Sequence, residues 1–379
     1  LLGKMNVFWT EASFTLVNYR DKCMLIKGWD DFNEHLENDL SSLSSMKLSS
    51  HFVTFEEEVK VWTERLGEVQ NVLQIWAVVQ RKWVYLEGVF SGSTDIQQQL
   101  PGESARFRSV DSDFTTLMRK ANAKGNALDI VIETPNLKKP LDLLNETLEK
   151  IQKALSEFLE KQRQAFARFY FVGDDDLLEI VGGGRDVGPV QKHFPKMFAG
   201  IANMGSANEG RLLQSINSKE EERLKLGHEI VIEEGMRVDR WLSLIEEEMR
   251  LSLHSESVSS LSTWRQHDQS ISDCVKSRFC VPSLIPGFQL YWTFEVEDNR
   301  LTPLHDFVAA LLVTLADIVM SQSNKLTRSR IEQMITELVH KRDMTQKMIS
   351  EERPVKDMFV WTSQLRFYLE GSDTKEAVH

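Results

Sequence analysis

The 379-residue chain has only three cysteines, Cys23, Cys274 and Cys280, and their irregular spacing fits no disulfide framework. So few thiols are typical of a protein from a reducing compartment. Cys274 and Cys280, with His267 nearby, lack the spacing of about two to four residues that zinc-ligand pairs usually show. We therefore expect ordinary buried or surface thiols rather than a metal site.

A surplus of positive charge is also missing. The sequence has 57 Asp and Glu against 45 Lys and Arg, a formal net charge of −12. Surfaces that bind nucleic-acid phosphates or anionic membranes need clustered Lys and Arg. The best local basic cluster, residues 325–330, is more typical of a solvated helix start. The composition therefore predicts no nucleic-acid partner and no membrane partner.

Long apolar runs are absent as well. The longest, residues 307–319, contains Thr314 and Asp317 and spans about 13 residues, whereas a membrane-spanning helix needs about 20. We expect a buried helix of a soluble protein here. The chain starts with Leu-Leu-Gly and has no signal-peptide pattern, so we expect it to be a segment of a longer polypeptide.

The sequence has none of the common catalytic motifs. It contains no P-loop, no Gly-x-Ser-x-Gly elbow and no His-Glu-x-x-His. The glycine-rich stretch 182–188 lacks the Lys-Ser/Thr of a P-loop, so we expect a flexible surface loop. His193 and His340 have no nucleophile or oxyanion motif beside them, which favours structural roles. We predict no catalytic, cofactor-binding or metal-binding residue in this chain.

Three consecutive acidic residues, Asp174, Asp175 and Asp176, leave two explanations open. Carboxylates bind Mg²⁺ or Ca²⁺, but the ligand spacing of a calcium loop is absent. The favoured alternative is a helix N-terminus at which Asp176 is the capping residue and Glu179 completes a capping box. Acidic side chains there would also complement the helix dipole.

The strongest positive signal is helical periodicity. Apolar residues at alternating steps of three and four form single helix faces. These faces comprise Trp62, Leu66, Val69, Leu73, Trp76, Val79, Trp83 and Leu86; Leu141, Leu144, Leu148, Ile151, Leu155 and Phe158; Leu304, Phe307, Leu311, Leu315 and Ile318; and Ile331, Met334, Ile335 and Leu338. Turn residues separate them, among them Ser91–Ser93, Pro101–Gly102, Pro135, Pro140 and Pro282–Pro286. Long amphipathic helices with polar outer faces predict helix-on-helix packing.

One region has an alternating pattern instead. Residues 211–216 and 224–232 are candidate strands with a turn at 217–219, which predicts a small antiparallel hairpin or meander near 200–232. The fold class is therefore mainly α, an elongated rod of consecutive helical bundles with this small sheet. We divide the chain into 1–135, 136–199, 200–235 and 236–379, where the last part resumes helical spacing at Trp241.

Several segments resemble the linker of dynein heavy chains. VVQRKWVYLEGVF at 78–90 is similar to the family's QRxWVYLEGIF, and Gly88, where axonemal members often have Pro, favours the cytoplasmic type. RFYFVGDDDLLEI at 168–180 is similar to RFYFVGDEDLLEI. Weaker similarities occur at 16–19, 28–31, 191–200, 335–340 and 359–368, while 182–188 and 253–286 match poorly. The family motifs single out Trp83, Tyr85, Leu86, Gly88, Phe169, Tyr170, Phe171, Gly173, Asp176, Leu177, Trp361 and Phe367.

The resemblance implies a mechanical role and no enzymatic activity in the chain by itself. In this family the linker bends and straightens across a ring of AAA+ modules, which bind ATP and Mg²⁺ and lie outside this sequence. Implied partners are that ring, microtubules through other parts, and accessory chains through an upstream tail, in the cytoplasm. The hinge candidates are 124–140 and the neighbourhood of Gly173. The competing hypothesis is a static helical scaffold that binds partner helices.

Overall fold

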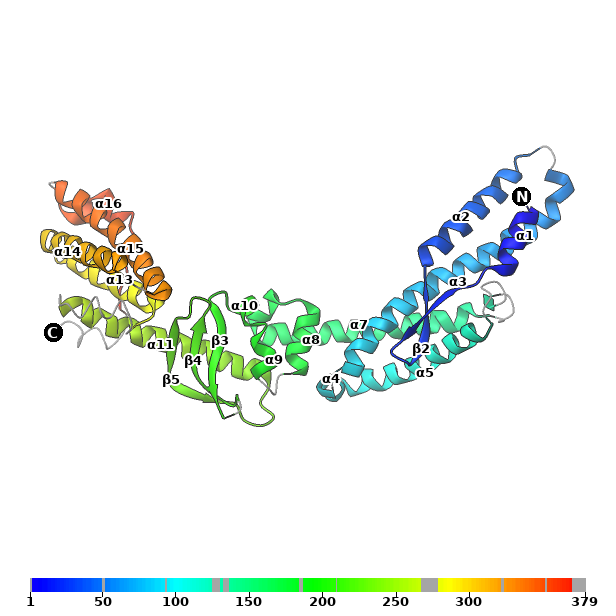
Figure 1. Cartoon of the computed structure of the whole chain (residues 1–379), viewed down its shortest axis with the longest axis horizontal. Coiled ribbons are helices and arrows are strands. Elements are labelled where there is room, and N and C mark those ends of the chain that lie inside the picture. Colours follow the sequence, from blue (N-terminus) through cyan, green and yellow to red (C-terminus); the bar gives the residue numbers. More distant parts are fainter. Residues whose placement is uncertain are drawn as a thin grey trace. The chain divides into compact units, whose positions relative to one another are not determined.

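The computed structural model describes residues 2–49, 52–92, 94–124, 130–131, 136–183, 187–208, 210–266, 279–321, 324–351 and 353–369. The chain forms two compact units: residues 1–164 with 177–183, and residues 165–176 with 184–379. Helices dominate both units, and each contains one small antiparallel sheet (Figure 1). The predicted mainly α fold class is confirmed.

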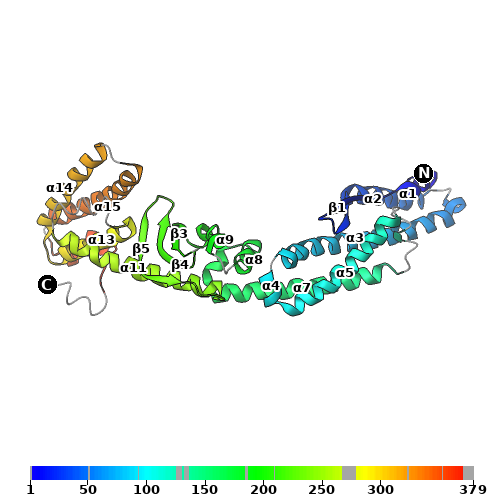
Figure 2. The same ribbon diagram turned by 60° about the horizontal axis from the view of Figure 1, so that its bottom comes forward.

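The first unit is built around one long helix, α3 (Phe52–Gly92). All eight members of the stripe from Trp62 to Leu86 are buried, as their spacing predicts. Helices α5 (Pro101–Lys124) and α7 (Lys138–Ala165) lie alongside α3 (Figures 1 and 2). The second stripe is buried on α7 except for Phe158, which is half-buried. Pro140 occupies the first turn of α7, where its missing N–H costs no hydrogen bond.

The first unit also contains a hairpin that the sequence pattern does not reveal. After α1 (Leu2–Glu11), strands β1 (Thr15–Tyr19) and β2 (Cys23–Lys27) pair antiparallel, and α2 (Trp29–Met46) follows. The expectation of a single β region was therefore wrong. The strands have five residues each, and β1 has no buried residue, so the alternation that identifies a half-buried strand is missing.

The second unit contains the predicted β region. Strands β3 (Ile201–Ala207), β4 (Leu212–Ser218) and β5 (Arg223–Val231) form an antiparallel meander in the order β3-β4-β5. The two predicted strands are confirmed with shifted ends. Strand β3 was not predicted individually, because Asn203, Gly205 and Ser206 interrupt its apolar pattern. Helix α11 (Val238–Gln266) packs against β5.

Four helices form the rest of this unit's core: α11, α13 (Val281–Glu297), α14 (Leu301–Met320) and α15 (Lys325–Ser350). The third and fourth stripes fall on α14 and α15 as predicted. The predicted break at Pro282–Pro286 was wrong, because both prolines lie inside α13. Pro282 occupies the first turn, and Pro286 is close enough to the start that few intrahelical hydrogen bonds are lost. The last two helical elements of the described residues are η3 (Val355–Asp357) and α16 (Phe359–Thr362).

Helix α14 is more apolar than a one-sided core helix requires. Within the part of the chain that the structure describes, it is the one helix with the length and composition to span a membrane, and 28% of its most apolar 18-residue window is buried. Leu304, Val308 and Leu315 face the core, whereas Val313 and Met320 are exposed. The expected buried helix is thus buried along one face.

The acidic cluster begins a helix, but in a different register from the one expected. Helix α8 (Asp174–Gly182) starts at Asp174, so Asp176 is its third residue and not its cap. The capping-box assignment of Asp176 was wrong, because Gly173 rather than Asp176 directly precedes the helix. Part of the glycine-rich stretch is helical too: Gly182 ends α8, and α9 (Val187–Gln191) includes Gly188, while 184–186 lie outside the described residues. Helix α10 (Phe194–Met197) follows.

Candidate functional site

Trp83 is the centre of an aromatic and polar cluster in the first unit. Its indole is fully buried, its Nε1 donates to Asp111 Oδ1 at 3.1 Å, and its ring stacks on Phe114 with centroids 4.6 Å apart. Tyr19 contacts the ring edge-on at 5.5 Å, and the Lys22 ammonium lies 5.5 Å from the ring centre. The hairpin β1–β2, α3 and α5 therefore meet at one side chain.

Glu87, one turn further along α3, ties the same hairpin to the helix. Its carboxylate accepts a hydrogen bond from the Tyr19 hydroxyl at 3.0 Å and pairs with Arg20 at 2.9 Å and Lys22 at 3.5 Å. Lys22 also reaches Asp111 at 2.8 Å. A buried carboxylate must be paired and hydrogen-bonded to remain charged, and Glu87 is both.

Two titration properties follow from this arrangement. Burial opposes ionisation of Glu87, but hydrogen bonds from Tyr19 and Ser91 and the charges of Lys22 and Arg20 outweigh it, so the pKa of Glu87 is lowered. Burial, followed by the hydrogen bond to Glu87, raises the pKa of Tyr19. The pair is therefore held as a carboxylate accepting from a neutral phenol.

The turn between β1 and β2, which carries Arg20 and Lys22, has a strained backbone. Arg20 and Asp21 have φ values of 49° and 54°, in the left-handed region that costs non-glycine residues about 1–2 kcal/mol each. The ion pair between Arg20 and Glu87 helps to hold this conformation. On the next strand, the buried Gln80 amide accepts from Ile26 N at 3.0 Å and donates to Ile26 O at 2.8 Å, which satisfies the outer edge of β2.

The remaining motif residues of the first unit differ in their surroundings. Leu86 is buried, Tyr85 is half-buried, and Gly88 is exposed with no atom within 4 Å of the place a Cβ would occupy. Leu177 on α8 is buried. The motif is thus mostly a packing face, and Gly88 lies on the outer surface of α3.

In the second unit, the short helix η1 (Ala167–Phe171) carries the second motif. Phe169 is buried, whereas Tyr170 and Phe171 are exposed. Arg168 contacts Glu246 at 3.0 Å, donates to Met197 O at 3.1 Å and stacks on Phe198 at 4.5 Å. Arg168 therefore fixes η1 to α10 and α11.

Asp176 joins the start of α8 to Lys196 on α10 and to His193 just before that helix. Its carboxylate lies 2.5 Å from Lys196 Nζ and 3.4 Å from His193 Nδ1. The hydrogen bond from Lys196, with the charges of Lys196 and His193, lowers the pKa of Asp176 despite some desolvation. His193 is buried. Gly173 precedes α8, and a Cβ there would meet Asp176 Oδ2 at 3.8 Å.

The C-terminal motif packs against the four-helix core. Trp361 is buried with its ring centroid 5.5 Å from that of Trp292. Trp292 Nε1 donates to Thr345 Oγ1 at 3.0 Å, and the buried Lys341 ammonium lies 4.1 Å from the Trp292 ring centre. Phe367 is half-buried, and its backbone N–H donates to Thr293 Oγ1 at 3.3 Å.

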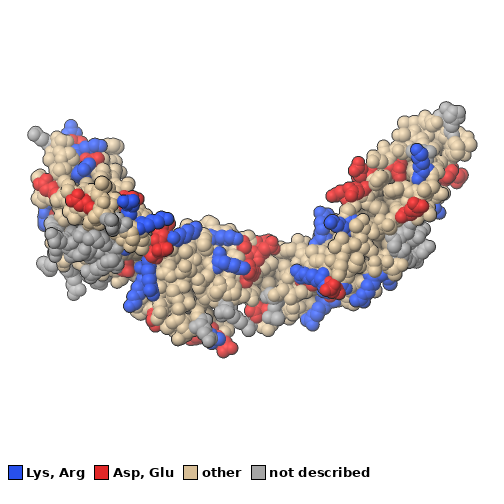
Figure 3. Space-filling model, viewed as in Figure 1, with Lys and Arg blue, Asp and Glu red and all other residues tan. Residues whose placement is uncertain are grey.

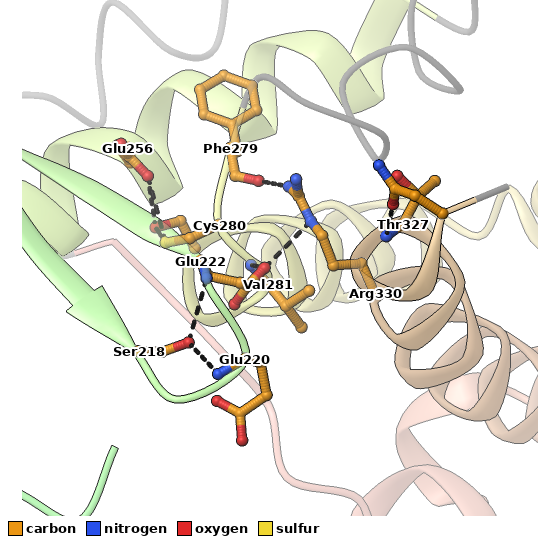
Figure 4. A network of polar contacts seen from close by, with 11 residues as sticks. Ser218, Glu220, Glu222, Glu256, Phe279, Cys280, Val281, Thr327 and Arg330 are labelled. Carbon is orange, nitrogen blue, oxygen red and sulfur yellow. Dashed lines mark hydrogen bonds and ion pairs between the residues drawn. The ribbon is translucent and has the colours of Figure 1, made fainter. Parts of the chain in front are cut away.

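A polar junction joins the sheet to the helices of the second unit. Figure 4 shows Glu222, Glu256, Cys280 and Arg330 in it, and Ser283 belongs to it through its contact with Glu256. Glu222 Oε1 lies 3.0 Å from Arg330 Nε and accepts from Val281 N at 3.1 Å. Ser283 Oγ donates to Glu256 at 2.9 Å. The basic cluster 325–330 does start a helix, with Asn324 as its cap, but Arg330 is buried, so a wholly solvated start was wrong.

The thiols and His340 have structural surroundings. Burial raises the pKa of Cys280 to about 11, which makes it an unreactive thiol. Burial also raises the pKa of Cys23. His340 Nε2 lies 3.2 Å from Gln364 Oε1, while Cys274 and His267 lie outside the described residues. Over the residues that the structure describes, no group of three or more His, Cys, Asp or Glu side chains could hold a metal ion.

Concave surface in both units is mainly apolar. A cavity of about 500 Å³ lies between α5 and α7 in the first unit. In the second, one of about 290 Å³ is lined by Ile201, Ile216, Leu224 and Leu253, with Arg168 and Glu222 among its polar residues. On the face drawn in Figure 3, Lys and Arg lie among Asp and Glu within each unit.

The motif residues therefore gather into local centres rather than one site. Trp83 and Leu86 share a face, and Trp361 and Phe367 pack on the same core. The polar partners Gln80, Glu87 and Asp111 were not predicted from the sequence. A signal existed for the first two: they continue the spacing of four and three around Trp76 and Trp83 on the buried face of α3, where an amide or a carboxylate needs a partner.

Comparison with known proteins agrees with the motif resemblance. Residues 1–260 match the family described as "Dynein heavy chain, N-terminal region 2". The cytoplasmic dynein heavy chain of Paramecium tetraurelia is 39% identical over 374 residues, which cover 97% of this chain and 8% of that protein. That of Drosophila melanogaster is 36% identical, over 99% of this chain and 8% of the protein. That of Neurospora crassa is 39% identical, over 100% and 9%.

The chain thus spans 8–9% of the length of these relatives. The similarity extends over nearly all of this chain, including α3 with Trp83 and the C-terminal helices beyond the matched family region. A match of this length and identity is specific, and the chain belongs to the dynein heavy chain family.

Proposed function

We propose that this chain is a mechanical lever of a dynein motor in the cytoplasm. Its two units would keep their internal shapes while the chain bends during the motor's ATP cycle and so passes a power stroke along the heavy chain. ATP turnover, with its Mg²⁺, would belong to AAA+ modules elsewhere in the heavy chain, and this segment would contribute none.

The observation that carries the proposal is the way each unit is fastened internally. In the first unit, the side chains around Trp83 and Glu87 link the hairpin, α3 and α5 through stacking, hydrogen bonds and ion pairs. In the second, Arg168, Asp176 and Arg330 each connect separate elements. Close-packed interiors resist gradual deformation, which is the property that a lever arm requires.

The bend is proposed to lie near Gly173 rather than in 124–140. The chain passes from one compact unit to the other at 164/165, 176/177 and 183/184, and Gly173 lies in the second unit, three residues before the passage at 176/177. Hinges are a few loop or element-terminal residues that absorb changes of φ and ψ. Gly173 directly precedes a helix and has no side chain. Most of the other candidate, 124–140, lies outside the described residues.

The partners follow from the same proposal. The lever would move against the AAA+ ring of its own heavy chain, whereas microtubules and accessory chains would bind other parts of the protein. The exposed Tyr170 and Phe171 are aromatic residues of the kind that anchor interfaces. The net charge of −12 favours a protein surface over nucleic acid or an anionic membrane as the partner.

A transplant tests this function. The matching segment of the Dictyostelium discoideum heavy chain, to which this chain is 37% identical over 385 residues, would be replaced by this chain in one motor and deleted in another. We expect the transplant to restore microtubule gliding. The deletion is expected to retain ATP turnover without gliding.

Two results would contradict the lever. If the deletion motor glides normally, the segment transmits no stroke. If the transplant folds, turns over ATP and binds its neighbours yet never glides, a static scaffold becomes the better account. ATP turnover by the isolated chain would contradict the assignment of hydrolysis to other modules.

A further inference from the structure

Side chains from three other elements form hydrogen bonds with the start of helix α13. Glu222, in the turn between β4 and β5, accepts from Val281 N at 3.1 Å. Glu256 on α11 accepts from Ser283 Oγ at 2.9 Å. Arg330 on α15 donates to the carbonyl of Phe279, the residue just before Cys280 and the helix (Figure 4). A sheet turn and two helices therefore converge on the first turn of a third helix.

The link between Glu222 and Arg330 closes this junction. Arg330 Nε lies 3.0 Å from Glu222 Oε1, and the two side chains are 9% and 13% exposed. Away from water, the attraction between two such opposite charges is strong. The turn itself is fixed locally, because Ser218 Oγ accepts from the N–H groups of Glu220 and Glu222 at 3.1 Å and 3.2 Å. The carboxylate of Glu222 thus extends from a rigid base.

The covalent route between the same two elements is long. From α15 back to β5 the chain runs through α14, α13, residues 267–278 and α11. The contact between Glu222 and Arg330 bypasses all of them. A displacement of α15 would therefore reach the sheet through two side chains before it reached the sheet through the backbone.

Stability alone is a weak reason for such a pair. Replacing a buried ion pair by uncharged residues of similar volume is often neutral for folding, whereas removing one partner leaves a buried charge uncompensated. What the pair adds over apolar packing is specificity, because a buried charge is destabilised when it separates from its opposite charge, whereas apolar side chains can slide past one another.

We propose that Glu222 and Arg330 are positioning residues that couple α15 to the sheet, so that a displacement of α15 during the movement of the lever is passed directly to β4 and β5. The inference rests on the proposed lever function and adds to it the path that this displacement takes inside the second unit. Neither residue touches a reacting group, and ATP turnover does not depend on the pair.

The test uses the full heavy chain with Arg330→Met, Glu222→Gln and the double variant. Gln keeps an acceptor for Val281 N–H, and Met keeps most of the aliphatic length of Arg330. The matched control is Arg342→Met on the same helix, whose pair with its neighbour Asp343 at 2.7 Å is partly exposed and joins no separate elements. Each motor is assayed for melting temperature, ATP turnover, stall force and amide exchange at the start of α13.

Arg330→Met is expected to speed amide exchange at Val281 by about 100-fold, because Glu222 is left buried and unpaired. The double variant should regain most of the melting temperature. It should nevertheless stall at about half the force of the unmodified motor with unchanged ATP turnover. Arg342→Met should match the unmodified motor in all four assays.

The decisive outcome is the double variant's stall force. A folded double variant with normal stall force would overturn the coupling role and leave the pair as a stabilising contact. That result would not contradict the proposed lever function, because the unmodified motor would still produce force. If deleting the whole segment left gliding intact, the lever would fail first, and this distinguishes the two failures.

Discussion

The indole N–H of Trp83 donates a 3.1 Å hydrogen bond to the carboxylate of Asp111, which also pairs with Lys22 at 2.8 Å. One carboxylate on α5 thereby connects the long helix α3 to the hairpin turn. Trp76, two turns earlier on α3, is equally buried, yet its Nε1 has no hydrogen-bond partner among the described residues. The two indoles share a helix and a buried face and differ in this bond.

Trp83→Phe should therefore destabilise the chain more than Trp76→Phe. Both changes remove a similar volume, but only the first breaks a bond to a charged acceptor. We expect a cost of about 3 kcal/mol for Trp83→Phe and about 2 kcal/mol or less for Trp76→Phe. Urea unfolding followed by circular dichroism measures both. Equal costs would mean that the bond to Asp111 contributes nothing.

Glu87 should make the first unit sensitive to acid. Its pKa in the folded chain is lower than the ordinary value of 4.5, so its contribution to stability is fully present above that value. The contribution is lost as the pH falls through the lower folded pKa. Unfolding free energy should drop as the pH falls below about 4.5 in the unmodified chain and less steeply in Glu87→Gln. Glu157→Gln, at an exposed position of α7 in the same unit, is the control, and an identical acid profile for both variants would exclude Glu87 as the source.

Two glycines should respond oppositely to alanine. A Cβ on Gly287 would lie 1.8 Å from Ser260 Oγ and 3.0 Å from Ser257 O, so α11 and α13 could not approach as closely as they do. Gly287→Ala should cost about 3 kcal/mol. Gly88 has open space around it inside helix α3, and Gly88→Ala should stabilise by about 0.5–1 kcal/mol.

Adding Ser260→Gly to Gly287→Ala provides the check on the cause. If the clash with Ser260 is responsible, the second change should recover part of the loss in thermal unfolding. No recovery would assign the cost to the backbone carbonyl of Ser257 instead.

Lys341 should make the stability of the second unit depend on pH in the alkaline range. Burial lowers its pKa from 10.5, with Glu337 opposing the shift. The charged form is therefore penalised in the folded chain at neutral pH, and stability from this group should rise as the pH approaches 10.5. Lys341→Met should abolish that rise without a loss of neutral-pH stability. Lys347→Met, at an exposed position of the same helix, should keep it, and a rise that survives in Lys341→Met would refute the assignment.

The long helices were predictable from the sequence because the apolar residues of each one repeat with helical spacing. Eight apolar side chains from Trp62 to Leu86 follow the spacing of one helix face, and all eight are buried. The hairpin β1–β2 had no such signal, since its stability comes from Gln80 and Glu87, which lie more than fifty residues away in sequence. Local patterns do not report partners at that distance.

The same limit explains the errors at Asp176 and Arg330. Local rules made one a helix cap and the other a solvated basic residue. Each instead pairs with a charge from another element, Asp176 with Lys196 and Arg330 with Glu222. The motif resemblance pointed to Trp83 and Trp361, both of which are buried, but did not supply their polar partners.

The most direct test of the lever follows two fluorescent labels through the ATP cycle of the full heavy chain. Val53 in the first unit and Phe359 in the second are exposed, as are Leu143 in the first unit and Val231 and Met320 in the second. Energy transfer between Val53 and Phe359 should change between nucleotide-free and ATP-bound motors, whereas the pairs Val53–Leu143 and Val231–Met320 should stay constant. Constant transfer for all three pairs would contradict the bending of this segment.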